Sequence, residues 1–389
     1  MAVARSLYLH IPFCRRKCFY CDFAITTAGA DLQATYVDAL CREIQLTARV
    51  WGTNPLDTIF FGGGTPSLLS VNQIDQILQT VHQYFGIEQD AEISLEANPG
   101  TVSLQSLEGY KASGVNRISL GAQAFQDHLL DLCGRGHRVV EIWEAVAAVK
   151  QAGISNFSLD LISGLPTQTL DHWQDSLQQA IQLEPQHLSV YDLIVEPGTA
   201  FFKRYQPGDR PLPSEDATVE MYLIARETLQ AAGFRHYEIS NYAQPGFACQ
   251  HNLVYWQNLP FYGMGMAATS YLDGKRSDRP RKMRDYLAMI ENQELPSSPI
   301  LSLEERLFET LMQGLRLAEG LDLQTLSTDF GEELYSTMLQ ILSDDQFQTW
   351  VQISDRLQLT QPQGWLFSDQ VITKLYELVN QTGMGASPS

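Results

Sequence analysis

The sequence LYLHIPFCRRKCFYCDF, residues 7–23, contains three of the chain's six cysteines, at positions 14, 18 and 21. They directly follow a short apolar run that ends at Pro12. Thiolates this close together on one loop can converge on a single small inorganic centre. A four-iron cubic cluster takes four thiolate ligands, so three cysteines leave one iron open to another ligand. The stretch therefore predicts an iron–sulfur site, and we expect the rest of the chain to build a pocket over the open iron.

A zinc site is the main alternative for this cysteine group. Structural zinc needs four ligands, and His10 with the three cysteines would supply a Cys3His set. However, structural zinc usually takes its ligands as two separated pairs, and His10 falls within an expected strand. The iron–sulfur interpretation is therefore preferred.

Charge and cysteine usage narrow the class of protein. The 389 residues carry a net charge of −19, which argues against nucleic acid as a main partner, because phosphate binding needs clustered Lys and Arg. Cys41, Cys133 and Cys249 are scattered, which favours a reduced compartment over a disulfide framework. The sequence shows neither a secretory signal nor eighteen uninterrupted apolar residues, so we expect a cytoplasmic protein.

Strand-then-helix units recur at roughly 30-residue spacing over residues 1–200, which implies parallel strands joined by right-handed crossovers. The expected strands are residues 6–11, 57–61, 92–96, 117–120, 157–162 and 187–193. Polar side chains cluster at the carboxyl ends of these strands, which form the active face of a barrel-like parallel sheet: Cys14, Thr65, Glu96, Gln123, Asp160 and Asp192. Six units are too few for an eight-stranded barrel, so the predicted α/β fold is a partial (βα)6 TIM-like barrel.

Two further regions follow the barrel. Residues 201–300 are expected to extend it and contain the stretch CQHNLVYW, residues 249–256. Residues 301–389 combine short helices with an alternating pair of segments, 349–353 and 357–360, which predicts a small winged-helix-like domain. Because this domain has 13 acidic and only 4 basic side chains, we expect a structural or protein-binding role and not DNA recognition.

A run of glycines, Gly62, Gly63 and Gly64, ends the second expected strand and is followed by Thr65 and Pro66. Backbone N–H and C=O groups with so little side-chain bulk around them could bind the amino group of a zwitterionic ligand. The run is not a phosphate-binding loop of the Walker type, because no Gly-Lys-Ser/Thr follows it.

The cysteine spacing and the GGGTP run together resemble a radical S-adenosylmethionine (SAM) enzyme. Further motifs occur in order along nearly the whole chain: YLHIPFC, FGGGTPS, the Glu96 strand, SLGAQAF, GRGH, LDLISGLP and LSVYDL. This series resembles the family that contains oxygen-independent coproporphyrinogen III oxidase and the HemW-like heme chaperones.

The resemblance implies a [4Fe–4S] cluster, with SAM bound to its open iron and cleaved to a deoxyadenosyl radical by one electron. By the same resemblance, Cys14, Cys18 and Cys21 hold the cluster, and Tyr8 and Tyr20 flank it. The implied SAM contacts are Gly63, Gly64, Thr65, Glu96, Gln123, Arg135 and Asp160. The residue chemistry agrees, since Glu96 can offset a sulfonium or ammonium charge, Arg135 can pair with a carboxylate and Asp160 can accept from ribose hydroxyls.

Two features distinguish between the branches of this family. The oxidase branch usually has another cysteine two positions after the third, where this chain has Phe23. The stretch HNLVYW, residues 251–256, resembles the heme-chaperone signature. His251 is the implied heme ligand, because a neutral imidazole suits heme iron, while Tyr255 and Trp256 offer flat apolar surface. Cys249 is either a second ligand or a packed thiol.

The predicted function is therefore a heme chaperone that delivers heme to acceptor proteins, including respiratory hemoproteins at the membrane. The cluster and SAM would then support assembly, homodimer formation or heme release. The alternative is an oxygen-independent coproporphyrinogen III oxidase that decarboxylates propionates through a deoxyadenosyl radical. A radical SAM transferase for another substrate is a third interpretation, which leaves HNLVYW unexplained.

Overall fold

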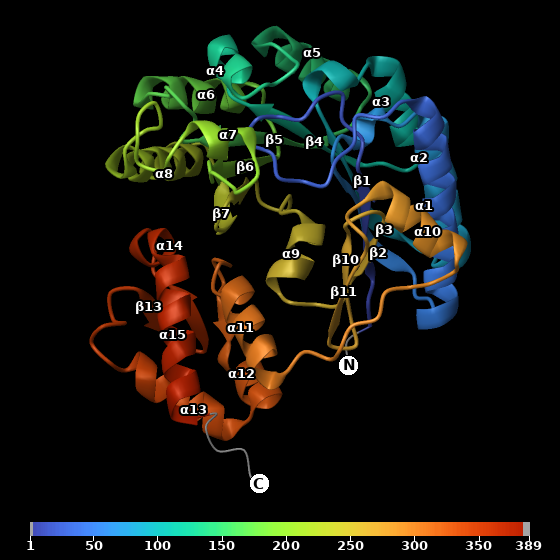
Figure 1. Cartoon of the computed structure of the whole chain (residues 1–389). Helices are drawn as coiled ribbons and strands as arrows, with labels where there is room; N and C mark the ends of the chain where they lie inside the picture. Colours follow the sequence, from blue (N-terminus) through green and yellow to red (C-terminus); the bar gives the residue numbers. More distant parts are fainter. Residues whose placement is uncertain (1–2, 384–389) are drawn as a thin grey trace. The chain divides into compact units, whose positions relative to one another are not determined.

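The computed structural model describes residues 3–383 and is drawn in Figure 1. Its main sheet has nine strands in the order β7-β8-β6-β5-β4-β3-β2-β1-β9. Strands β1 to β6 run parallel to one another, and β9 runs parallel to β1. The predicted succession of parallel strands is thereby confirmed.

The strands of the main sheet are β1 (Ser6–Ile11), β2 (Leu56–Gly63), β3 (Ile87–Ala97), β4 (Arg117–Gln123), β5 (Asn156–Ser163), β6 (His187–Asp192), β7 (Arg235–Glu238), β8 (Asn241–Ala243) and β9 (Tyr262–Met264). The helices that connect them are α1 (Ala30–Trp51), α2 (Val71–Tyr84), α3 (Leu104–Ala112), α4 (Asp127–Leu132), α5 (Val139–Gln151), α6 (Leu170–Gln182), α7 (Ala200–Arg204), α8 (Glu215–Ala231) and α9 (Gln250–Trp256). A hairpin of β10 (Thr269–Leu272) and β11 (Lys275–Asp278) and helix α10 (Met283–Glu291) follow β9.

Helices α1 to α6 follow one another around the outside of the parallel strands (Figure 1). This arrangement explains the near-continuous apolar strands, because a parallel sheet covered by helices is buried on both faces. All seven residues of β4 are buried, and α1 presents Tyr36, Leu40 and Ile44 to the core as its helical periodicity predicts. The carboxyl ends of the strands stay free of these helices and can carry a site.

The chain divides into two compact units. Within the described residues, the first comprises residues 3–235, 242–251 and 260–298, and the second comprises residues 236–241, 252–259 and 299–383. The second unit contains α11 (Leu303–Gly314), β12 (Leu321–Asp322), α12 (Leu323–Phe330), α13 (Glu332–Leu342), β13 (Val351–Ile353), β14 (Arg356–Leu359), α14 (Gln363–Leu366) and α15 (Ser368–Gly383). Strands β12, β13 and β14 form a small antiparallel sheet, around which these helices bury their own core, which includes Leu311, Phe347 and Trp365. Within residues 3–383, no helix has both the length and the apolarity needed to cross a membrane.

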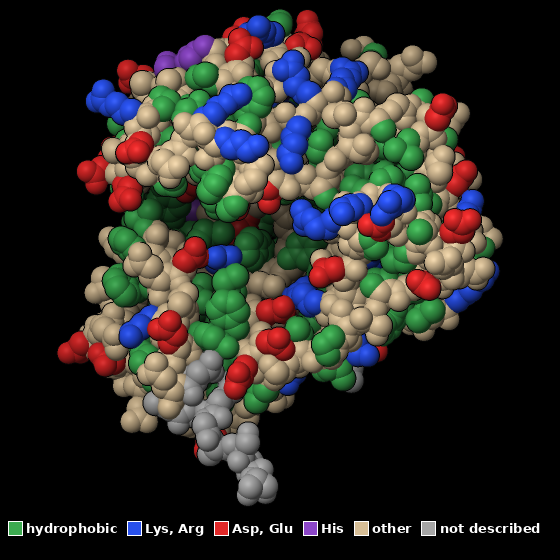
Figure 2. Space-filling model, viewed as in Figure 1, with side chains coloured by type: hydrophobic (Ala, Val, Ile, Leu, Met, Phe, Trp, Pro, Cys, Tyr) green, Lys and Arg blue, Asp and Glu red, His purple; other side chains and the backbone are tan. Residues whose placement is uncertain are grey.

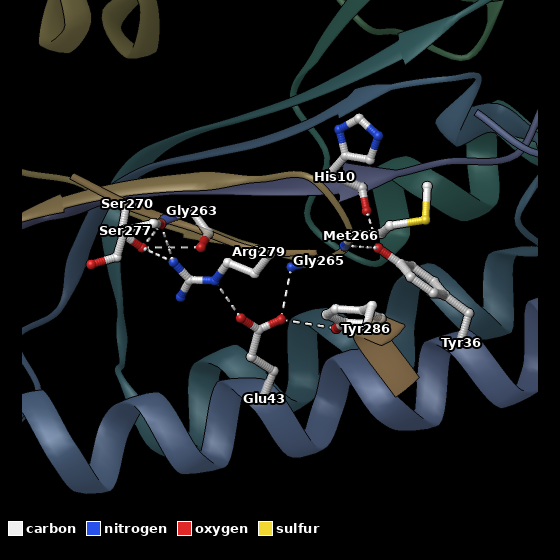
Figure 3. A network of polar contacts seen from close by, with 10 residues as sticks. All are labelled: His10, Tyr36, Glu43, Gly263, Gly265, Met266, Ser270, Ser277, Arg279 and Tyr286. Atoms are coloured by element: carbon white, nitrogen blue, oxygen red, sulfur yellow. Dashed lines mark hydrogen bonds and ion pairs between the residues drawn. The ribbon is translucent and has the colours of Figure 1, made fainter. Parts of the chain in front are cut away.

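A buried polar network attaches β9 and the following hairpin to α1 (Figure 3). The Glu43 carboxylate on α1 lies 2.7 Å from Nε of Arg279 and accepts from Tyr286 Oη at 2.8 Å. It also accepts from the backbone N–H of Gly265 at 2.8 Å. Beside it, Tyr36 Oη donates to the carbonyl of His10 at 2.6 Å and accepts from Met266 N. The last strand of the sheet is therefore fixed to β1 by charged and polar groups as well as by its own ladder.

Replacing Arg279 with Met should destabilise the fold strongly, because the Glu43 side chain is 0% exposed and would lose its cationic partner. We expect the free energy of unfolding to fall by about 3–5 kcal/mol, measured by urea denaturation. Arg284, which is 90% exposed in its pair with Asp285, provides the control, and Arg284→Met should change stability by less than about 0.5 kcal/mol. Equal effects of the two substitutions would contradict the role of the network.

Candidate functional site

A cavity of about 520 Å³ lies at the carboxyl ends of the parallel strands in the first unit. Its lining includes all the residues predicted for cluster and SAM binding except Tyr8: Cys14, Cys18, Tyr20, Cys21, Gly63, Gly64, Thr65, Glu96, Gln123, Arg135 and Asp160. These residues come from the loop after β1, from β2 to β5 and the turns that follow them, and, for Arg135, from the loop between α4 and α5. Tyr8 instead stacks on Phe60, with ring centroids 6.3 Å apart, and its hydroxyl lies 3.1 Å from Nδ1 of His10.

The three clustered cysteines lie on a loop that the backbone closes at its base. The N–H of Cys14 donates to the carbonyl of Thr26 at 2.9 Å, and the N–H of Thr26 donates back to Pro12 at 2.7 Å. The thiols of Cys14, Cys18 and Cys21 are free and half-buried. Burial raises the pKa of Cys14 and raises that of Cys21 to about 11. A metal centre binds thiolates, so its binding here would displace protons.

The geometry around His10 does not favour the Cys3His zinc site. The Nε2 of His10 lies 3.0 Å from the carbonyl of Ala24, which can only accept, so Nε2 carries the proton and Nδ1 accepts from Tyr8. Both ring nitrogens are thereby occupied away from the thiols. Over the described part of the chain, no three His, Cys, Asp or Glu side chains are grouped to hold one metal ion, whereas a four-iron cluster is larger and holds its thiolates further apart.

Glycines at the end of β2 allow this strand to approach the cysteine loop closely. Gly63 has φ +109°, and a Cβ there would lie 2.6 Å from the His10 ring. A Cβ on Gly64 would lie 2.7 Å from the carbonyl oxygen of Phe13. Both positions therefore require glycine, and the backbone of the run forms part of the cavity wall.

Two carboxyl groups give the cavity a site for positive charge. Burial, together with the nearby carboxylate of Asp160, raises the pKa of Glu96 to about 8, although the Gly63 N–H donates to Glu96 at 3.0 Å. Burial also raises the pKa of Asp160, which accepts from Ser119 Oγ at 3.0 Å and also bonds to Ser189. A bound cation, such as an ammonium or sulfonium group, would stabilise the ionised form of both.

Arg135 joins the cysteine loop to the rest of the cavity. Its Nη1 lies 3.5 Å from both Cys18 Sγ and Tyr20 Oη, and its Nη2 donates to the carbonyl of Gly121 at 2.6 Å. Nη2 also donates to Asn98 Oδ1. The Nε of Arg135 is buried and has no hydrogen-bond partner within the described residues, so it is one donor left for a bound anion.

Sequence reasoning missed several residues of this cavity. Asn98 donates to Thr65 Oγ1 at 2.9 Å and links it to Arg135, and no motif in the sequence marked it as a site residue. Ser119 holds Asp160 across neighbouring strands, and although it begins the motif SLGAQAF, no role was assigned to it. Gln123, which was predicted, has φ +70°, a conformation that is rare outside glycine and typical of functional sites.

Cations and apolar side chains gather at the mouth of the cavity. Arg15, Arg16 and Lys17 line it and are exposed, as is Phe23 at 58%. Figure 2 shows Lys and Arg side chains gathered over the part of this face that belongs to the first unit, while Asp and Glu are spread around it. The net negative charge of the chain is therefore unevenly distributed.

His251 lies away from the cavity, in the first turn of α9. Its side chain is fully buried, and its Nδ1 is 2.7 Å from Thr58 Oγ1 near the beginning of β2. Its ring stacks on Phe60 with centroids 5.3 Å apart. Burial lowers the pKa of His251 to about 3, which keeps the imidazole neutral. Cys249 is also buried, and its Sγ donates to Glu92 Oε1 at 3.5 Å.

Comparison with known proteins places the chain in a family. Residues 8–180 match the model of the radical SAM superfamily, and residues 301–367 match the HemN C-terminal domain. The chain is 45% identical to the heme chaperone HemW of Synechocystis sp., over 97% of each chain. The chain belongs to the HemW family. The HemW proteins of Bacillus subtilis and Escherichia coli are 36% and 39% identical, over 87% and 81% of this chain and 90% and 83% of their own.

The fold of this HemW family member is also that of a solved structure. Coproporphyrinogen III oxidase (HemN) from Escherichia coli superposes with a TM-score of 0.81 and 23% identity, over 96% of this chain and 89% of that one. The likeness confirms the predicted α/β radical SAM fold with its additional C-terminal region. At this identity it shows the fold alone.

Membership of the HemW family, within the radical SAM superfamily, implies a [4Fe–4S] cluster and SAM. The residues present fit both groups. Three thiols on one closed loop supply a soft donor set of the kind that iron–sulfur clusters need. The paired carboxyls of Glu96 and Asp160 suit the positive groups of SAM, and the buried Nε of Arg135 suits a carboxylate.

Removing one cysteine of the loop should remove the cluster. After anaerobic reconstitution, we expect Cys18→Ala to contain less than about a tenth of the iron and sulfide of the parent protein, because too few thiolates then remain to hold the cluster. Cys41→Ala serves as the matched control, since Cys41 is a packed thiol on α1. Full iron and sulfide content in Cys18→Ala would show that the ligand assignment is wrong.

The raised pKa of Glu96 predicts a pH-dependent stability. The folded, cofactor-free protein favours the neutral acid, so this carboxyl stabilises the fold fully below its ordinary pKa of 4.5, and the contribution is lost as the pH rises through about 8. Between about pH 5 and 8, this loss lowers the free energy of unfolding of the parent protein. In Glu96→Gln the decrease over the same range should be smaller by about 1–3 kcal/mol. Urea denaturation across this range tests it, with exposed Glu108→Gln as control. Parallel curves for parent and Glu96→Gln would contradict the assignment.

Proposed function

We propose that this chain is a heme chaperone, which binds heme and passes it to acceptor hemoproteins on a scaffold that also holds a [4Fe–4S] cluster and SAM. The observation that carries the proposal is the 45% identity, over 97% of each chain, with a protein named heme chaperone HemW. The motif HNLVYW at residues 251–256 and the absence of a further cysteine at Phe23 support it.

His251 is the proposed ligand to the heme iron. Its imidazole is neutral, as an iron ligand must be, because burial keeps its pKa low. The geometry by itself does not distinguish it from a structural histidine. His187 is equally buried, and its Nδ1 lies 2.8 Å from Ser158 Oγ, much as Nδ1 of His251 lies 2.7 Å from Thr58 Oγ1. The motif therefore carries the assignment, and His187 becomes its natural control.

The cavity residues have the role of holding the cluster and SAM. When bound, this pair supplies one-electron chemistry. The chain's own contribution is to hold positive charge between Glu96 and Asp160, to present the backbone of Gly63 and Gly64, and to keep Arg135 directed toward the cysteine loop. We propose that this site supports assembly, homodimer formation or heme release.

We also propose that the heme acceptors include respiratory proteins at the membrane, and that the chaperone meets them from the cytoplasm. The exposed cations Arg15, Arg16 and Lys17 support a peripheral encounter with an anionic membrane surface, because juxtaposed basic side chains are attracted to anionic lipids.

Substituting His251 should weaken heme binding without unfolding the chain. We expect His251→Ala, with its cluster reconstituted, to lose at least about ten-fold in heme affinity in an anaerobic titration followed by the Soret absorbance. His187→Ala should retain the parent affinity, although it removes a histidine of the same burial. Equal affinity in His251→Ala and the parent would show that the proposed heme ligand is wrong.

The oxidase alternative is tested on the same preparation. The parent protein is incubated with coproporphyrinogen III, SAM and a reductant, and protoporphyrinogen is measured over several enzyme equivalents. A heme chaperone should form none. Multiple turnovers would contradict the proposed function and support the oxidase.

A further inference from the structure

The described state of His251 cannot ligate heme. Its side chain is 0% exposed, and its ring is enclosed between the Thr58 hydroxyl and the face of Phe60. A heme iron can reach an imidazole only after one side of the ring is uncovered. The proposed ligand is therefore observed in a closed state, and the contacts that hold it closed set the free energy of opening.

Glu92 holds the beginning of α9 from a neighbouring strand. Its carboxylate on β3 accepts from the backbone N–H groups of Gln250 and His251, both at 3.2 Å, and from the thiol of Cys249 at 3.5 Å. The two backbone N–H groups are the first donors of α9, and they have no hydrogen-bond acceptor within the helix itself. One half-buried side chain thus fixes three successive residues, of which the last is the proposed ligand.

Thr58 fixes the side chain of His251, whereas Glu92 fixes its backbone. The hydroxyl of Thr58 is buried and lies 2.7 Å from Nδ1 of His251. Thr58 is paired with Glu92 in the register of β2 and β3, so the two residues lie side by side on adjacent strands. They form one anchoring point, which we call the His251 latch.

His251 lies in an element that could move and uncover its ring, whereas His187 does not. His187 stands in β6, between β5 and β8 in the middle of a hydrogen-bonded sheet, and cannot leave without breaking that sheet. His251 stands in a helix of seven residues. The chain passes from the first compact unit to the second directly after it. The latch is therefore the last fixed point of the first unit before this boundary.

We propose that Glu92 and Thr58 are positioning residues that keep His251 closed in the heme-free protein, and that heme ligation requires their release. The inference rests on the proposed heme-binding role of His251. Because the affinity of a ligand is reduced by the fraction of protein in the competent state, the latch lowers the affinity for free heme. Acceptor proteins would then receive heme from a carrier that closes again on its own ligand.

Weakening the latch should accelerate heme binding. In stopped-flow measurements of the Soret band with the cluster-loaded protein, we expect Thr58→Val and Glu92→Gln each to raise the rate of heme binding by about five- to ten-fold. Thr58→Ser keeps the hydroxyl and should behave as the parent. Glu88→Gln, at an exposed position on the same strand, should also leave the rate unchanged.

The final heme spectrum separates release of the latch from a general structural effect. Because Thr58 and Glu92 act only on the closed state, the heme-bound spectra of both variants should be identical to that of the parent. Parent-like or slower binding in Thr58→Val and Glu92→Gln, with binding still dependent on His251, would overturn the latch but leave the proposed function standing. Binding that persists in His251→Ala would instead overturn the proposed heme site.

Hydrogen exchange on the unmodified protein gives a test that needs no variant. The amides of Gln250 and His251 donate to Glu92 in the closed state and should exchange slowly. Addition of heme should raise their exchange rates at least about ten-fold, while amides of β4 stay protected. Unchanged or greater protection of these two amides with heme bound would overturn the proposal.

Discussion

The close approach of β2 to β1 at their carboxyl ends is the constraint on which the rest of the site depends. A Cβ at Gly63 would meet the His10 ring at 2.6 Å, and one at Gly64 would meet the Phe13 carbonyl at 2.7 Å. Only glycine permits this contact. It places the backbone that faces a ligand directly beside the loop that holds the three thiols. The cysteine loop and this wall of the cavity are therefore in direct contact, and a side chain at either glycine would push them apart.

The polar groups of the cavity are divided according to charge. Glu96 on β3 and Asp160 on β5 stand on either side of β4, and the burial of both makes the ionised pair unfavourable until a cation arrives. Arg135 lies instead against Cys18 and Tyr20, with Nη1 3.5 Å from Cys18 Sγ and from Tyr20 Oη. We expect an elongated ligand with a cationic and an anionic part to prefer one orientation in such a cavity. The two carboxyls stand on β3 and β5, whereas Arg135 stands in the loop between α4 and α5.

Much of the fold was predictable from local signals, because strand periodicity, glycines and clustered cysteines each report on a few neighbouring residues. The six parallel strands were expected in this way, and so were the cysteines and the polar residues at the strand ends, whereas Tyr20 and Arg135 were implied only by the family resemblance. Tyr8, implied in the same way, packs behind the wall against Phe60. The Glu43–Arg279 pair was not predictable, since the two residues are 236 positions apart and each resembles an ordinary surface charge in sequence. Burial of His251 was hidden for a related reason. The motif around His251 indicates a heme ligand. The burial of its side chain, however, depends on Thr58 and Glu92, which are far from it in sequence.

The three adjacent cations of the cysteine loop have a kinetic consequence. On a chain with a net charge of −19, Arg15, Arg16 and Lys17 form a local region of opposite sign at the mouth of the cavity. Anionic molecules are repelled by most of the surface and attracted to this one opening, so the direction of approach is selected before any contact forms. Such steering acts over about one Debye length, roughly 8 Å at physiological ionic strength, and it weakens as salt is added. The same loop that holds the thiols therefore also determines how fast, and from which side, a negatively charged molecule arrives.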